Sequence, residues 1–361
     1  MPAMRRREFL LSPAAATLRI GAGERLRLGL DSYSIRDLGW KATRLLEYAA
    51  SLELDALQIA IPGELESQEP AYLHKLRNEA ARSGIYLDTA AGCICPASAA
   101  YNPLAGDPVQ YLLRCLRLSR ELGAPVMRCF VGGPDDRRSG RPIEALIEAT
   151  LKVLRSARQQ ALEMGVKVAI ENHGEMQSQE LKTLVEEAGR DWVGVCLDTG
   201  NPFHVLEDPL QTYEILGPFT LTTHVRDSVV WEHARGAAFQ WVALGDGCLD
   251  LRALMQAHAQ LCPRAPVQLE IITGRPPYIL PYWEQEFWKF FPRVRAADFV
   301  RFVQLARRGY PFQGAMMIGG SGPQPPEFQA ALRRQQQYDF ERSVTYARTR
   351  LGLGLRERSR T

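Results

Sequence analysis

The sequence predicts a closed (β/α)8 barrel with a helical C-terminal extension. Three observations support this fold class. Eight short apolar segments recur along the chain, helical patterns separate them, and most neighbouring segments begin about 27–45 residues apart, the size of one βα unit. The segments are continuously apolar rather than alternating, as expected for parallel strands buried on both faces. The predicted strands cover residues 26–35, 55–62, 85–92, 125–132, 166–172, 192–198, 219–227 and 266–272.

Helical periodicity lies between these strands. Segment 40–54 places Ala42, Leu45 and Ala49 on one face, and segment 108–123 has the same pattern and ends in glycine. Further helices are expected over 142–165, 179–189 and 250–261. The rival fold, an open doubly wound sheet, is disfavoured because no G-x-G-x-x-G follows the first strand and no P-loop is present.

Three regions follow from this pattern: a leader over 1–25, the barrel over 26–275 and a helical extension over 276–361. The extension contains an aromatic cluster, a Gly/Pro loop and a long final helix. We expect it to pack on the barrel or to form a homo-oligomer contact. The leader contains Arg6-Arg7-Glu8-Phe9-Leu10, which resembles a twin-arginine export signal. Export to the periplasm and a cytoplasmic basic N-terminus both remain open.

Composition excludes several classes of partner. A net charge of +3 over 361 residues gives no reason to expect nucleic acid, and the chain has no apolar run of membrane-spanning length. The seven cysteines have no regular spacing, so neither a disulfide framework nor a thiolate zinc site is indicated.

The last four predicted strands each carry a metal-ligand type at or near the carboxyl end. These residues are Glu171, Asp198, His224 and Glu270. Carboxyl ends of barrel strands surround one mouth, so the four side chains are expected to converge. Three carboxylates and an imidazole suit one divalent ion: Mn²⁺ first, with Mg²⁺, Co²⁺ or Zn²⁺ as alternatives. Without a cation, at least one carboxylate would have to take up a proton.

These strings resemble a known family. "VAIENH", "CLDTGN", "THVRD" and "VALGDGCLDLRAL" are similar to the sugar isomerase/epimerase group of xylose isomerase-like TIM barrels, which includes D-tagatose 3-epimerase, hydroxypyruvate isomerase and inosose dehydratase. The resemblance covers roughly residues 26–275. It implies that Glu171, Asp198, His224 and Glu270 bind the metal and that Glu171 and Glu270 act as catalytic acid and base. Those epimerases usually have a histidine where this chain has Asn201, and His204 follows three residues later.

Other residues are predicted to contact substrate. Asn201, His204, Tyr33 and Arg128 are expected near the pocket, and His173 has either such a contact or a structural role. Arg226 binds a substrate hydroxyl or phosphate, or else pairs with Asp227. Asp246 lies in a "GDG" loop that is either a substrate contact or a plain turn.

The predicted function is a metal-dependent isomerase or epimerase of a sugar, keto-sugar or cyclitol, acting by carboxylate-mediated proton transfer through an enediolate that the metal stabilises. The small-molecule carbohydrate is its only expected partner besides another copy of the chain. A lyase or dehydratase acting on a keto-sugar or inosose would use the same residues. A non-catalytic sugar-binding barrel or complex subunit is the third possibility. DNA-repair endonucleases of the same barrel type are disfavoured because the chain has few histidines and near-neutral charge.

Overall fold

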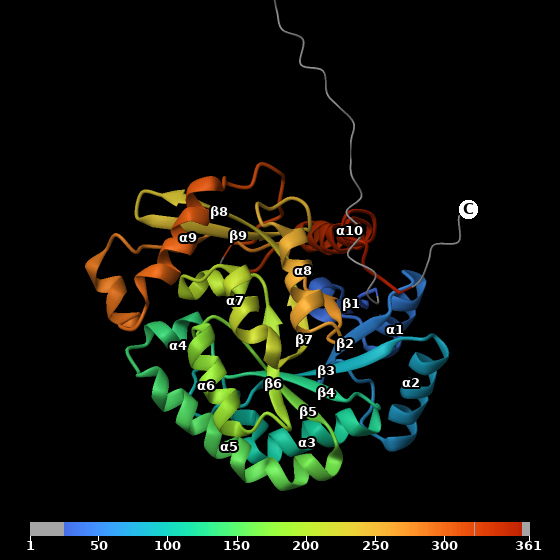
Figure 1. Ribbon diagram of the computed structural model, residues 1–361. Coiled ribbons are helices and arrows are strands. Elements are labelled where there is room, and N and C mark those ends of the chain that lie inside the picture. The colour runs from blue at the N-terminus through green and yellow to red at the C-terminus, as the bar shows by residue number, and fades with distance from the viewer. Residues whose placement is uncertain (1–24, 321, 356–361) are drawn as a thin grey trace, which may run out of the picture.

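Eight parallel strands close into a barrel in the computed structural model, which describes residues 25–320 and 322–355 (Figure 1). The last barrel strand is β10, which pairs with β7 on one side and with β1 on the other. The predicted fold class is therefore confirmed. The barrel strands are β1 (Leu28–Asp31), β2 (Ala56–Ala60), β3 (Tyr86–Cys93), β4 (Val126–Phe130), β5 (Lys167–Glu171), β6 (Val193–Asp198), β7 (Thr220–Val225) and β10 (Val267–Leu269).

Helices surround the barrel, and the main apolar core fills the layer between them and the strands. Several begin at an aspartate cap: Asp107 accepts from the backbone N–H of Gln110, and Asp250 from that of Ala253. These helices are α1 (Ala42–Ser51), α2 (Pro70–Arg82), α3 (Pro108–Glu121), α5 (Ile143–Met164), α6 (Ser178–Ala188), α7 (Pro209–Leu216) and α8 (Leu251–Leu261). Short helical turns in the connections are η1 (Ser32–Leu38), η2 (Pro103–Ala105), α4 (Pro134–Arg138), η3 (Asn201–Val205) and η4 (Gly217–Phe219).

A second sheet lies beside the barrel mouth (Figure 1). It has three antiparallel strands, β8 (Asp227–His233), β9 (Gly236–Val242) and β11 (Tyr278–Leu280). Helix α9 (Ala296–Arg308) and the turn η5 (Gln285–Phe290) pack against it around a separate aromatic core. The sequence pattern did not predict this sheet, and β11 departs from the expected helical character of the region after residue 275.

The long final helix α10 (Pro326–Leu351) packs on the barrel beside η1, α8 and β10 (Figure 1). Its buried apolar residues include Phe340, Val344 and Leu351. Polar contacts also fix it, because Thr273 donates to Asp339 at 2.7 Å and Arg342 pairs with Asp246 at 2.5 Å. The C-terminal segment thus covers the barrel wall next to its closing strand.

No helix within residues 25–320 and 322–355 combines the length and apolar character that a membrane crossing requires. The predicted leader lies outside the described residues, apart from Arg25.

Candidate metal centre and active site

Four side chains meet at the carboxyl ends of successive barrel strands. Glu171 is the last residue of β5, Asp198 is the last residue of β6, His224 lies in β7 and Glu270 follows β10 directly. One ligand atom from each lies within 4.8 Å of the other three, and all four residues are buried. The structure thus brings together the four residues that the sequence placed at one mouth.

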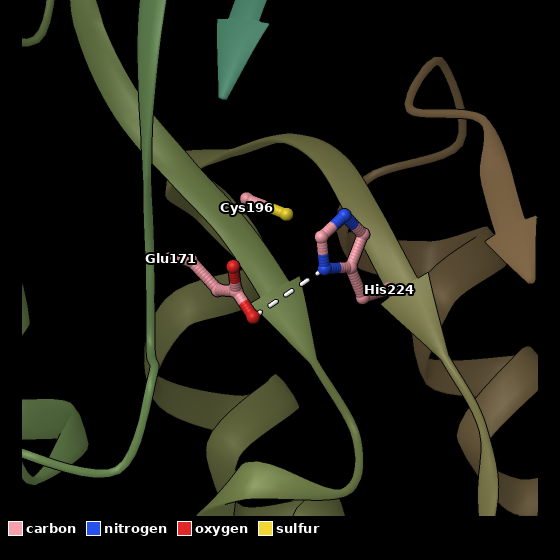
Figure 2. A group of neighbouring side chains, drawn as sticks. All are labelled: Glu171, Cys196 and His224. Carbon is pink, nitrogen blue, oxygen red and sulfur yellow. Dashed lines mark ion pairs between the residues drawn. The ribbon is translucent and has the colours of Figure 1, made fainter. Parts of the chain in front are cut away.

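His224 is oriented by a contact from β2. Its Nε2 lies 2.7 Å from Gln58 Oε1 and 3.1 Å from Asp31 Oδ2. Gln58 Oε1 faces Nε2, so Nδ1 is the ring nitrogen that is directed at the cluster. Nδ1 lies 3.4 Å from Glu171 Oε1 and 3.5 Å from Glu270 Oε2. Figure 2 shows the imidazole facing Glu171, with Cys196 of β6, the strand between β5 and β7, beside them.

Two arginines neutralise the carboxylates. Arg128 from β4 pairs with Glu171, while Arg226 pairs with both Asp198 and Glu270. The guanidinium of Arg226 also lies 4.7 Å from the centre of the Trp241 ring. Pairing of Arg226 with Asp227, one of the two sequence-based alternatives, is therefore not what the structure shows.

Asp227 has a different role, in the second sheet. Its carboxylate accepts hydrogen bonds from the backbone N–H groups of Ser228, Gly245 and Gly247, and so holds the "GDG" loop. Arg226, the residue between β7 and β8, instead directs its guanidinium to Asp198 and Glu270.

The two glutamates have different electrostatic surroundings. Burial raises the pKa of Glu171, but the charges of Arg128, His224 and His173 outweigh burial and hold this pKa well below its ordinary value. Burial also raises the pKa of Glu270, and there Arg226 and His224 do not overcome it. Glu171 is thus the more acidic carboxyl of the pair.

The residues fit a divalent cation. His224 Nδ1 is buried and lacks a hydrogen-bond partner among the described residues, and Glu270 Oε2 lies 3.5 Å from it beside the guanidinium of Arg226. Buried polar atoms normally have partners, so the unpartnered Nδ1, with three carboxylates around it, is where a cation would be held. Cys196, which Figure 2 shows between Glu171 and His224, is a further potential ligand within the same distance limit. Burial raises the pKa of its thiol to about 11, which keeps it protonated without a metal.

A cavity of about 490 Å³ opens above these residues. Its polar lining includes His224, Glu270, Arg128 and Arg226, and its apolar lining includes Phe130, Ile272, Trp241 and Tyr278. Trp241 comes from β9 and Tyr278 from β11, so the second sheet supplies one wall. A side chain at position 200 would collide with Arg226 and Trp241, because a Cβ on Gly200 would lie 2.5 Å from Arg226 Cδ and 2.7 Å from Trp241 Nε1.

Most predicted substrate contacts also line this cavity: Tyr33, Arg128, His173, Asn201, His204 and Arg226. The Nδ1 of His173 lies 2.6 Å from the carbonyl oxygen of Gly132, and its ring packs on Phe130. Asn201 donates to Glu171 Oε1 at 3.1 Å, so it contacts a metal-ligand candidate directly.

His204 lies among the rings of Phe239, Trp241 and Tyr278. Burial, and then Arg138 and His173, lower its pKa to about 3, so the imidazole is neutral. Asp246 is the exception among the predicted contacts. It is absent from the cavity lining, and its carboxylate pairs with Arg342 of α10.

The sequence reasoning missed several functional candidates. Gln58 and Asp31 are polar residues in otherwise apolar strands, a signal that could have identified both. Trp241 and Tyr278 were missed because their sheet was not predicted. Arg138 and Arg275, which also line the cavity, lie in connections after β4 and β10 and have no local pattern.

A family model described as xylose isomerase-like TIM barrel matches residues 46–278. The chain belongs to this family. The family resemblance inferred from the strand-end motifs is therefore confirmed.

Three xylose isomerase-like proteins illustrate the range of the family. The 3-oxo-isoapionate decarboxylase of Pectobacterium atrosepticum is 24% identical over 243 residues, which make up 64% of this chain and 80% of that protein. A crystal structure of D-psicose 3-epimerase in the presence of D-fructose has a TM-score of 0.56 at 17% identity, covering 91% of this chain and 100% of that chain. The IOLI protein, with a bound zinc atom, has a TM-score of 0.54 at 16% identity, covering 78% and 95%. At these identities, the two structures support the shared fold alone.

Proposed function

We propose that this protein is a divalent-metal-dependent isomerase or epimerase of a sugar, keto-sugar or cyclitol. The observation that carries the proposal is the meeting of Glu171 and Glu270 with Asp198 and His224 at one barrel mouth, beside a cavity that His224 and Glu270 line. Glu171, Asp198, His224 and Glu270 would hold the ion, for which their oxygen and nitrogen donors favour Mn²⁺, with Mg²⁺, Co²⁺ or Zn²⁺ as alternatives. When bound, a divalent cation polarises a carbonyl group and stabilises negative charge that develops on neighbouring oxygens.

The residues of the chain supply the proton transfers. One glutamate removes a proton from the carbon beside the substrate carbonyl, and the other returns a proton. Return to the same carbon on the opposite face inverts it, and return to the neighbouring carbon moves the carbonyl. Arg128 and Asn201 hold Glu171, while Arg226 holds Glu270. We infer that these contacts keep both carboxylates in fixed positions around the substrate.

A lyase is the second candidate, and the observation that favours it is the similarity to 3-oxo-isoapionate decarboxylase over 64% of the chain. Loss of carbon dioxide from a 3-oxo acid leaves an enolate like the one that loss of a proton forms. Glu270 or Glu171, in its protonated form, could then donate a proton to this enolate and be reprotonated from water. Loss of mass from the substrate would identify this reaction, whereas isomerisation or epimerisation conserves mass.

Deuterium exchange tests the proposal. Purified protein is analysed for metal, loaded with Mn²⁺ and incubated in D₂O with a panel of ketoses and inososes, and the products are followed by NMR and mass spectrometry. We expect one carbon-bound hydrogen to exchange in at least one substrate. Absence of exchange in every substrate would contradict the proposal and leave a sugar-binding barrel. Full activity of Glu171→Gln would remove Glu171 from the acid–base pair.

A further inference from the structure

The cavity has an arginine that the proposed chemistry does not use. Arg138 is the last residue of α4, the short helix that follows β4, and it lines the same cavity as His224 and Glu270. It is half-buried. Its guanidinium has no hydrogen-bond or ion-pair partner within residues 25–320 and 322–355.

The other cavity arginines are already engaged. Arg128 pairs with Glu171, and Arg226 pairs with Asp198 and Glu270. Arg275 donates to the hydroxyl of Tyr33 at 3.3 Å. The guanidinium of Arg138 is therefore the one in this cavity whose donors have no acceptor among the described residues.

The helix that carries Arg138 is held in place on both sides. Asp136 accepts from Ser98 Oγ at 2.8 Å and from the backbone N–H of Ala99 at 2.9 Å. Arg137 donates to the carbonyl of Phe290 at 2.7 Å and to Glu180 at 2.6 Å. These contacts fix α4, and with it the backbone position of Arg138 beside the cavity.

Partial burial of an unpaired guanidinium is unfavourable, and an incoming anion would relieve it. Burial lowers the pKa of Arg138, and the Asp135 carboxylate opposes this only in part. A divalent ion and the two paired arginines would balance the carboxylates of Asp31 and Glu270, which line the cavity, and those of Glu171 and Asp198 beside them. Arg138, Arg275 and Asp135 then leave one net positive charge, which matches a monoanion better than a phosphate dianion.

We propose that the substrate is a sugar acid and that Arg138 binds its carboxylate while the carbonyl end of the molecule reaches the four-residue cluster. The inference deepens the proposed function, on which it rests, by naming the substrate class of the same cavity. A guanidinium binds a carboxylate through two parallel N–H···O bonds, which adds orientation to affinity. The carboxylate anchor would thus set which carbon of the substrate lies between Glu171 and Glu270.

Calorimetric titration tests this with three small, unreactive probes of similar size: L-threonate, its neutral counterpart L-threitol, and glycerol 3-phosphate. Wild-type protein is compared with Arg138→Gln and with Arg141→Gln, an exposed arginine on the same connection that does not line the cavity. Each protein is titrated both metal-free and loaded with Mn²⁺, because a hydroxy acid can also chelate an ion. Thermal melting of each variant verifies that it is folded.

We expect Arg138→Gln to weaken L-threonate binding by about 10-fold or more in both metal states, the loss typical of a charge-assisted hydrogen bond. Arg141→Gln should bind like wild type, and L-threitol should bind equally to all three proteins. Equal L-threonate binding by wild type and Arg138→Gln would overturn the inference. Stronger, Arg138-dependent binding of glycerol 3-phosphate would overturn the assignment to a carboxylate.

The result is separable from failure of the proposed function. Arg138-dependent L-threonate binding without deuterium exchange in any substrate would leave the acid site standing and remove the isomerase assignment. Deuterium exchange confined to neutral ketoses, with unchanged rates in Arg138→Gln, would support the isomerase assignment and remove the carboxylate site.

Discussion

Glu171 and Glu270 share a cluster but differ in what neutralises them. Arg128 and Asn201 contact Glu171, and Arg226 contacts Glu270. Glu171 thus has the Arg128 guanidinium as its ion-pair partner, whereas Glu270 shares the Arg226 guanidinium with Asp198. A glutamine has the same shape but cannot transfer a proton at neutral pH, so the exchange of glutamate for glutamine isolates proton transfer from packing.

Glu171→Gln and Glu270→Gln are each expected to lower the rate of deuterium exchange by about 10²- to 10⁴-fold, the usual contribution of a general acid or base. NMR in D₂O measures the rate. Glu186→Gln on the outer face of α6, which is exposed, serves as the control and should retain the wild-type rate. A full rate in either of the first two variants would show that its carboxylate does not transfer the proton.

Gln58 positions His224 rather than contacting substrate. Gln58→Leu removes the acceptor for the Nε2 proton, so we expect Mn²⁺ affinity to fall by about 10- to 100-fold. Isothermal titration with Mn²⁺ gives the affinity directly. Gln160→Leu, at an exposed position on α5, should bind the ion like wild type. An unchanged affinity in Gln58→Leu would mean that packing alone orients the imidazole.

Some residues of the candidate site could be placed from the sequence pattern and others could not. Glu171, Asp198, His224 and Glu270 could be placed together because each lies where a continuously apolar strand ends, and strand ends share one mouth. The partner of Arg226 and the place of Asp246 could not be foreseen. Both depend on long-range contacts, to Asp198 and to Arg342, that have no trace in local periodicity.

Glu207 links two elements. It follows η3, and its carboxylate accepts from the backbone N–H of Ser178 at 3.0 Å and from the Ser178 hydroxyl, at the first turn of α6. Burial raises its pKa from 4.5 to about 7, against the opposing hydrogen bonds from Ser178. The folded protein therefore holds this proton more tightly than the unfolded chain, and deprotonation makes folding less favourable.

The protonated Glu207 side chain contributes a pH-dependent stabilisation of the folded protein. This contribution is fully present below about pH 4.5 and is lost as the pH rises through about 7. The free energy of unfolding of wild type, relative to that of Glu207→Gln, should fall by up to about 3 kcal/mol across this range. Urea unfolding at several pH values measures it. A difference that does not vary with pH would mean that Glu207 titrates normally.

Among the strands, those of the barrel could be predicted from the sequence and those of the second sheet could not. The buried barrel strands were found because their apolar runs are continuous, as in β6 (Val193–Asp198). The strands β8 and β9 are separated by only Ala234 and Arg235, and the sequence pattern assigned no element to residues 228–242. The three-residue strand β11 is too short to stand out from the aromatic residues around it, and it exists because β9 offers an edge to pair with.

At the scale of the whole molecule, the candidate metal centre joins strands that are far apart in sequence, from β5 to β10. An ion held by all four residues binds the folded barrel but not the unfolded chain, so it stabilises the fold by mass action. Metal removal is expected to lower stability by about 4 kcal/mol at an ion concentration 1,000-fold above the dissociation constant.

Thermal melting with and without a chelator, followed by restoration with Mn²⁺, measures this loss. Asp198→Asn, which weakens one ligand, should show a smaller shift between the two conditions. Identical melting temperatures for wild type in both conditions would show that these strands do not share an ion.

The connection between β7 and α8 leaves the cylinder to form β8 and β9, and the connection after β10 returns to add β11. The candidate metal residues consequently lie on barrel strands, whereas Trp241 and Tyr278 of the cavity wall lie on the second sheet. Substitutions in residues 227–242 and 275–280 could therefore change substrate specificity during evolution while the four metal-ligand candidates stay unchanged. Exchanging these two segments between relatives would be a rational way to redesign which substrate is turned over.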